Sequence, residues 1–165
     1  MIVISDTSVI TNLAAIEQLH LLSQLYNQVI IPEAVYRELT EIEPPVPGKI
    51  EVKNAPWVEI RQVVNRSIVQ QIQEQARLDI GESEAISLAL ELKADLLLID
   101  ERRGRMEANR LGLRITGLLG LLIEAKQRDL IIAVKPLMDT LITMSAFRVS
   151  SALYNQILEI VNELE

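Results

Sequence analysis

The chain of 165 residues contains no cysteine. This absence excludes thiolate zinc sites, catalytic thiols and disulfide scaffolds, and it fits a reducing compartment. A compact domain of this length buries roughly 70% of the surface that its unfolded form exposes, so folding requires neither disulfides nor a structural metal. We therefore expect residues 1–165 to form a single domain.

Long apolar runs are also missing. None approaches the roughly 18 residues that a membrane-spanning helix requires. The first residues do not show the charged and apolar regions that precede the cleavage site of a signal peptide. We expect a cytoplasmic protein with no membrane partner.

Basic residues are fewer than acidic ones, with 16 Lys and Arg against 23 Asp and Glu and a net charge of −7. This balance argues against a protein that coats nucleic acid nonspecifically, because phosphate binding depends on clustered cations. Five arginines nevertheless gather in one short segment: Arg102, Arg103, Arg105, Arg110 and Arg114. They form either a solvated helix face with Arg–Glu pairs or a surface that contacts phosphate.

Apolar periodicity predicts strands and helices in alternation, which is typical of an α/β fold with three α/β/α layers and a central parallel sheet. Strands are expected over residues 1–5, 28–31, 57–60, 96–99 and 113–116. Helices are expected over residues 7–24 with a break near Ala15, and over 32–42, 67–78, 81–92, 102–111, 117–128, 136–144 and 150–164.

Two segments depart from this alternation. Residues 43–48 contain three prolines and cannot continue a helix, so they form the clearest loop. Residues 130–165 are expected to form C-terminal helices, separated by a linker at 145–148, that pack on the domain or on a second subunit. The last helix carries an apolar stripe made of Leu153, Ile157, Ile160, Val161 and Leu164. Packing on the same domain is the favoured interpretation.

Acidic residues stand at the ends of several expected elements. Asp6 and Asp100 each follow an apolar strand, and both would emerge at the same sheet edge if these strands were parallel neighbours. Glu82 stands at a helix start, where an acid also favours the helix dipole, and Glu38 lies on a helix where it could simply face solvent. Together these acids favour a Mg²⁺ or Mn²⁺ site, because both ions prefer oxygen ligands.

The same residues carry a family resemblance. Asp6-Thr7-Ser8 after the first strand, Glu38 in a helix, Gly81-Glu82-Ser83-Glu84 and Leu98-Ile99-Asp100 follow one another in an order that resembles a PIN domain. The chain is most similar to small prokaryotic PIN proteins related to the toxins of toxin–antitoxin pairs. The resemblance implies a metal-dependent endoribonuclease, with Ser8 and Asn12 near its site and with Mg²⁺ or Mn²⁺ bound by Asp6, Glu38, Glu82 and Asp100. It also implies RNA as substrate, a small antitoxin as partner, and a homodimer.

Two ligand assignments stay open. Glu84 competes with Glu82, and Glu101 adjoins Asp100 at a place where a hydroxyl of the family pattern is missing. Three arginines next to these acids are expected to hold the RNA backbone: Arg102, Arg103 and Arg105. The only histidine, His20, lies in a leucine-rich stretch and is expected to be structural.

Two other functions compete with the nuclease. An inactive PIN-like module would bind RNA or protein without cleaving it. A small α/β phosphatase would need an Asp-x-Asp pair on the first strand, and Ser8 stands where the second acid should be.

Overall fold

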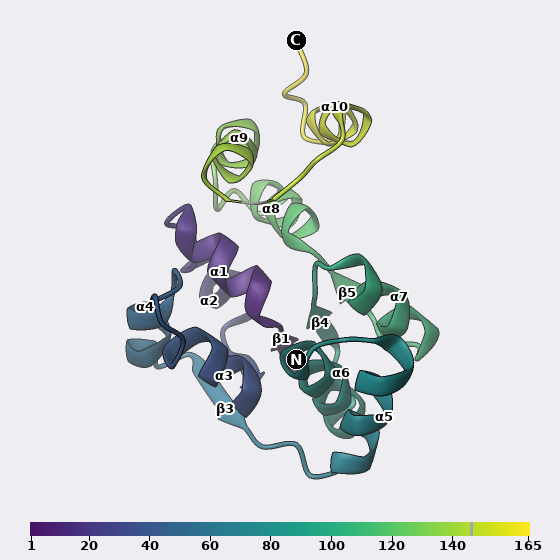
Figure 1. The fold of residues 1–165 in the computed structure, drawn as a ribbon. Coiled ribbons are helices and arrows are strands. Elements are labelled where there is room, and N and C mark those ends of the chain that lie inside the picture. Colours follow the sequence, from purple (N-terminus) through teal and green to yellow (C-terminus); the bar gives the residue numbers. More distant parts are fainter. Residues whose placement is uncertain (146) are drawn as a thin grey trace.

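A five-stranded parallel sheet forms the centre of the molecule in the computed structural model, which describes residues 1–145 and 147–165 (Figure 1). The strand order is β3-β2-β1-β4-β5, and every neighbouring pair is parallel. The strands are β1 (Val3–Ser5), β2 (Val29–Pro32), β3 (Val58–Arg61), β4 (Leu96–Leu98) and β5 (Ile115–Thr116). The predicted α/β class and parallel sheet are confirmed.

The helices follow the predicted periodicity with one exception. They are α1 (Thr7–Ala15), α2 (Leu21–Tyr26), α3 (Glu33–Thr40), α4 (Lys49–Asn54), α5 (Arg66–Ala76), α6 (Ile80–Leu92), α7 (Arg102–Arg110), α8 (Leu118–Gln127), α9 (Lys135–Met144) and α10 (Ser151–Ile160). The helical stripe at the N-terminus breaks after Ala15, as predicted. Helix α4 was not predicted, because its six residues are too few to show an apolar period.

Both faces of the sheet are covered, because successive strand residues point to opposite sides. Val3, Ile31 and Leu98 belong to the cluster that packs with α1, α2, α8, α9 and α10. Ile4 and Leu97 belong to the cluster that packs with α5, α6 and α7. The sheet thus separates two apolar layers, which confirms the three-layer α/β/α arrangement.

The strand order reverses at the β1–β4 pair. The chain first builds β2 and β3 on one side of β1, and then crosses to place β4 and β5 on the other side. Ser5 pairs with Leu98, and the Asp6 amide donates a hydrogen bond to the Leu98 carbonyl at 3.0 Å. Open α/β sheets bind ligands in the crevice at such a reversal, beyond the carboxyl ends of the strands.

The C-terminal helices pack on the chain itself. Helices α8, α9 and α10 lie together at one end of the molecule (Figure 1), and Ile157 and Val161 are buried in the same cluster as Val3. The other members of the predicted stripe, Leu153, Ile160 and Leu164, are exposed. Ala146, in the predicted linker, lies outside the described residues. Throughout the two described segments, no helix has both the length and the apolar character to cross a membrane.

Glu163 links the C-terminal residues to the start of α9 through hydrogen bonds. Its carboxylate accepts hydrogen bonds from the amides of Val134 at 2.8 Å and Lys135 at 2.9 Å, and it pairs with the Lys126 ammonium at 3.2 Å. The two amides belong to the first turn of α9, which has no partner within its own helix. A single side chain therefore joins α8, α9 and the residues that follow α10.

We expect Glu163→Ala to lower the free energy of unfolding by about 1–3 kcal/mol, because it leaves these partners unsatisfied. Urea unfolding followed by circular dichroism measures the change. Glu165→Ala is the matched control, since Glu165 is an exposed acid two residues away. Equal stability of the two variants would contradict this role for Glu163.

Candidate functional site

Asp6 lies buried at the carboxyl end of β1. Its side chain caps α1 by accepting a hydrogen bond from the Val9 amide at 3.1 Å, and the Ser8 hydroxyl donates to its other oxygen at 3.2 Å. Burial, together with the nearby Asp100 carboxylate, raises the pKa of Asp6 to about 7, although the hydrogen bonds from Val9 and Ser8 oppose that rise. The fold thus holds an acid where a carboxylate is electrostatically unfavourable.

Asp100 lies beside Asp6, two residues beyond the end of β4. The Leu118 amide, at the start of α8, donates to its Oδ1 at 3.4 Å. Its Oδ2 is buried and has no hydrogen-bond partner among the described residues. Burial raises the pKa of Asp100, while the Leu118 amide and the Arg105 charge oppose that rise.

Gly117 permits this placement of Asp100. A Cβ at position 117 would stand 2.7 Å from Asp100 Oδ1, and it would also meet the Arg105 guanidinium. Any larger residue would therefore displace either the acid or the arginine.

Glu82 reaches the same region from the first turn of α6. Asp79 caps this helix by accepting a hydrogen bond from the Glu82 amide at 2.8 Å. Burial raises the pKa of Glu82 well above its usual range, and a hydrogen bond with the Glu101 carboxyl group and the charge of Asp79 add to the shift. The fold thus holds Glu82 next to Glu101 in an environment that disfavours the charged form of Glu82.

Glu38 approaches from α3. The Thr7 hydroxyl donates a hydrogen bond to it, and the Gly81 amide contributes another. A Cβ at position 81 would lie 2.5 Å from Glu38 Oε1, so any larger residue there would displace the Glu38 carboxylate. Burial raises the pKa of Glu38, and the charge of Asp79 raises it further.

Glu84 points elsewhere. Its buried carboxylate accepts hydrogen bonds from the Ala34 amide at 3.0 Å and from the Arg66 guanidinium at 2.7 Å. It therefore ties α6 to the start of α3 and to α5. Of the two competing acids, the structure places Glu82 at the site and Glu84 in a structural contact.

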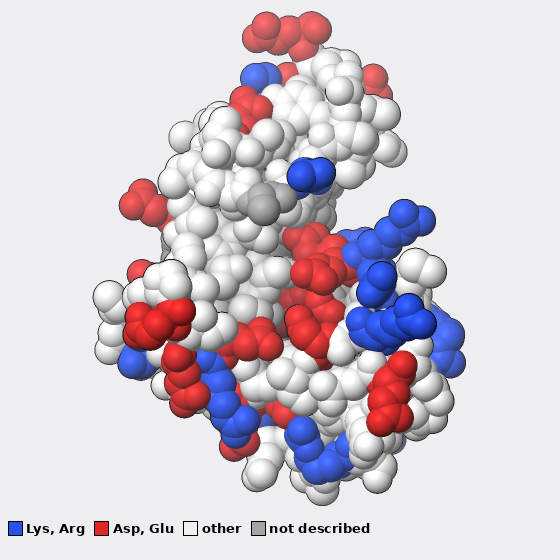
Figure 2. Space-filling view, viewed as in Figure 1, with Lys and Arg blue, Asp and Glu red and all other residues white. Residues whose placement is uncertain are grey.

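Two adjoining cavities are lined by the acids described above, apart from Glu84, and by the predicted residues Ser8, Asn12 and Glu101. The first, of about 280 Å³, is lined by Asp6, Ser8, Glu38, Glu82 and Glu101, together with Thr7, Thr11 and Asp79. The second, of about 310 Å³, is lined by Ser8, Asn12, Asp100 and Glu101, together with Phe147 and Arg148. Figure 2 shows acidic side chains gathered in a central hollow, with basic side chains along the α7 side of it. We call this region the acidic hollow.

The arginines of α7 divide into two groups. Arg102 and Arg105 line a third cavity that also includes Asp100, whereas Arg103 lines none of these three cavities. Arg110 pairs with Glu107 at 2.5 Å, which is the Arg–Glu pair of a solvated helix face. The solvated-face interpretation therefore holds for Arg110, and a phosphate contact by Arg102 and Arg105 stays a prediction.

Sequence reasoning missed several residues near the acidic hollow, among them Asp79, Phe147 and Arg148. Asp79 stands three residues before Glu82, a spacing typical of a helix cap, and this signal could have found it. Phe147 and Arg148 follow α9 and return to the hollow from a distant part of the chain. No local pattern marks them, because only the packing of α9 and α10 places them there.

The donor set fits a divalent ion held by few protein ligands. Within the described segments, no group of three or more His, Asp or Glu side chains is arranged to hold a metal. Mg²⁺, however, often uses one or two carboxylates and keeps several waters. The unpartnered Asp100 Oδ2 and the raised pKa of the neighbouring Asp6 are what such an ion would relieve.

Comparison with protein families gives one match over nearly the whole chain. The family model described as "DUF3368: PIN domain" matches residues 2–163. Comparison with curated proteins gives no match.

We expect Glu82→Gln to stabilise the metal-free protein, and more at about pH 8 than at about pH 5.5. The folded pKa of Glu82 is raised above its ordinary value of 4.5, so the carboxyl group costs stability as pH rises from that value toward the folded pKa. Melting temperatures measured in chelator at both pH values test this. A variant no more stable than the parent at the higher pH would contradict the electrostatic description.

Glu84→Ala should have the opposite effect. The change leaves the buried Ala34 amide without a partner, and we expect the free energy of unfolding to fall by about 1–3 kcal/mol. Urea unfolding measures it, with the exposed Glu74→Ala as control. If Glu84→Ala were as stable as its parent, the contact would carry no structural role.

Proposed function

The chain belongs to the PIN-domain family, and from this premise we propose that it is a metal-dependent endoribonuclease that uses Mg²⁺ or Mn²⁺ in the acidic hollow. PIN domains are generally nucleases, which are hydrolases, and they typically use divalent metals. Two points go beyond the family and are proposed here. The substrate is RNA, and the metal binds in the acidic hollow.

One observation carries it. Asp6 and Asp100 follow neighbouring parallel strands at the point where the strand order reverses, and one buried oxygen of Asp100 has no partner among the described residues. A fold does not ordinarily bury two acids side by side without a compensating cation. Asp6 and Asp100 are therefore the proposed direct ligands.

The other acids have supporting roles in this account. A divalent ion bound there would supply a water of lowered pKa and would neutralise the charge that develops on the phosphate. Glu82 lies beside this position together with Glu101, and its carboxyl group, whose pKa is raised by burial, can accept or release a proton. Glu38, held by Thr7 and Gly81, positions the start of α1 and adds negative charge.

RNA that is single-stranded or looped is the proposed substrate, because an acidic hollow flanked by arginines requires an exposed phosphate. We further propose that the protein is the toxin of a toxin–antitoxin pair, acts in the cytoplasm as a homodimer and is neutralised by a small antitoxin. The family resemblance supports these assignments.

A second function is favoured by one specific observation. Because the described acids include no group of three or more arranged to hold a metal, an inactive PIN-like module that binds RNA or protein without cleaving it is the alternative. Metal-dependent cleavage distinguishes the two.

We expect Asp6→Asn to reduce RNA cleavage in Mg²⁺ or Mn²⁺ by about a hundredfold or more, since metal catalysis supplies several kcal/mol of transition-state stabilisation. Rates on a labelled single-stranded RNA measure the loss, and circular dichroism checks the fold. Asp129→Asn is the matched control, because Asp129 is exposed and lines none of the described cavities. Cleavage by Asp6→Asn at the rate of its parent would refute the proposed ligand.

Metal binding should also be visible without any substrate. A ligand that binds only the folded state stabilises it by about 2.7 kcal/mol at a free concentration of about 100 Kd. We expect Mn²⁺ to raise the Tm of the parent and of Asp129→Asn, but to leave that of Asp6→Asn nearly unchanged. An equal rise in all three would place the ion elsewhere.

A further inference from the structure

A further cavity adjoins the acidic hollow on the α7 and α8 side. It has a volume of about 640 Å³, within the range of about 300–1,000 Å³ typical of ligand sites, and it lies between α7, β5, α8 and α10. It shares Asp100 with the acidic hollow, and Phe147 and Arg148 line both. The geometry points to a pocket that takes an unstacked nucleobase of the RNA, next to the phosphate that is cleaved. This inference rests on the proposed function.

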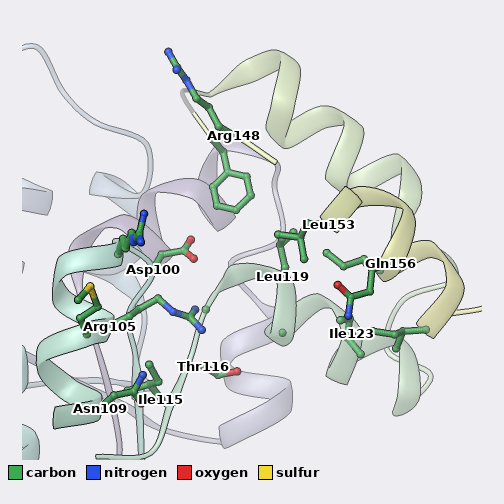
Figure 3. A pocket seen from close by; sticks show the side chains of 17 residues that line it. Asp100, Arg105, Asn109, Ile115, Thr116, Leu119, Ile123, Arg148, Leu153 and Gln156 are labelled. Atoms are coloured by element: carbon green, nitrogen blue, oxygen red, sulfur yellow. The ribbon is translucent and has the colours of Figure 1, made fainter. Parts of the chain in front are cut away.

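The end of the cavity nearest the hollow is cationic. Three arginines line the cavity with a single acid, Asp100, although the whole chain carries a net charge of −7, and one of them, Arg148, lies at the rim with its side chain extending outward (Figure 3). None of Arg102, Arg105 and Arg148 has a carboxylate within ion-pairing distance, and none of their side chains makes a hydrogen bond among the described residues. Unpaired guanidinium groups are suited to phosphate oxygens, which they bind in bidentate fashion.

The other end is apolar with a few polar side chains. Leu119, Ile123 and Leu153 form part of its wall, and Gln156 adds an amide. Figure 3 shows Asp100 and Arg105 on the α7 side of the cavity, with Leu153 and Gln156 reaching it from α10. An apolar wall with few hydrogen-bonding groups suits a planar base, whose faces are apolar and whose edges are polar.

Phe147 stands where this cavity meets the acidic hollow. It is the only phenylalanine in the chain, it is half-buried, and it lines the cavity as well as the hollow. Base–aromatic stacking is the usual way in which proteins hold single-stranded nucleic acid without reading a long sequence. Phe147 is therefore the proposed stacking partner.

The charges favour RNA over a protein segment as the occupant. A protein helix would need only the apolar wall and would leave the three arginines without partners. A nucleotide uses both ends at once, because its phosphate can lie next to the arginines while its base lies against the apolar wall. Because the cavity shares Asp100 with the acidic hollow, a ligand that fills it lies next to that hollow.

Base-dependent binding can be measured without cleavage. We would use the Asp6→Asn chain in chelator, and compare a fluorescent single-stranded RNA with an abasic ribose-phosphate strand of equal length by anisotropy. The intact RNA should bind about tenfold more tightly, in keeping with loss of one stacked base. Phe147→Ala should remove this difference, whereas Phe147→Tyr, which keeps the ring, should preserve it and shows that the position tolerates change.

The arginines should behave differently. Arg105→Ala should lower the dependence of log affinity on log salt by about 0.7, the value for one phosphate contact on a single strand, while the preference for intact RNA remains. Arg114→Ala is the matched control, because Arg114 is exposed and lines none of the described cavities. It should change neither quantity.

Two results would overturn the pocket. If abasic and intact strands bound equally, or if folded Phe147→Ala kept the preference, no base would occupy the cavity, and its apolar wall would be left to a protein segment. Failure of the proposed function would give a different experimental result. A parent chain that shows base-dependent binding but cleaves no RNA in Mg²⁺ or Mn²⁺ would contradict the nuclease and keep the pocket.

Discussion

The parallel pairing of β1 with β4 is the constraint on which the site depends. Ser5 lies opposite Leu98, so the residues that follow the two strands emerge together where the strand order reverses. A slip of one residue in this register would turn the apolar side chains of β4 to the opposite faces of the sheet, and the two apolar layers prevent it. Burial of the core thereby fixes the distance between Asp6 and Asp100.

The acidic hollow is stable because the rest of the fold compensates for it. Helix starts provide the amides of Val9, Glu82 and Leu118, and these amides bond to Asp6, Asp79 and Asp100 respectively. The raised pKa values of Asp6, Glu38, Glu82 and Asp100 show that this compensation is incomplete. Incompletely compensated buried charge is typical of functional sites, where the positions of the groups suit a ligand at a cost in stability.

Local patterns in the sequence predicted the sheet, most helices and the acids that stand at strand ends and at a helix start. Apolar periodicity and strand-end positions are short-range signals. They did not separate Glu82 from Glu84. Both lie on one helix, and only the packing of α3 and α5 against α6 gives Glu84 its partners, Ala34 and Arg66. Phe147 and Arg148 were missed for the same reason, since their place beside the hollow depends on contacts between distant segments.

The central claim is that Asp6 and Asp100 bind one divalent ion. Diffraction from crystals grown with Mn²⁺, recorded at a wavelength where manganese scatters anomalously, tests it most directly. We expect an anomalous peak in contact with a carboxylate oxygen of each of these two residues. A well-ordered acidic hollow without such a peak, or a peak bound only by other acids, would contradict it.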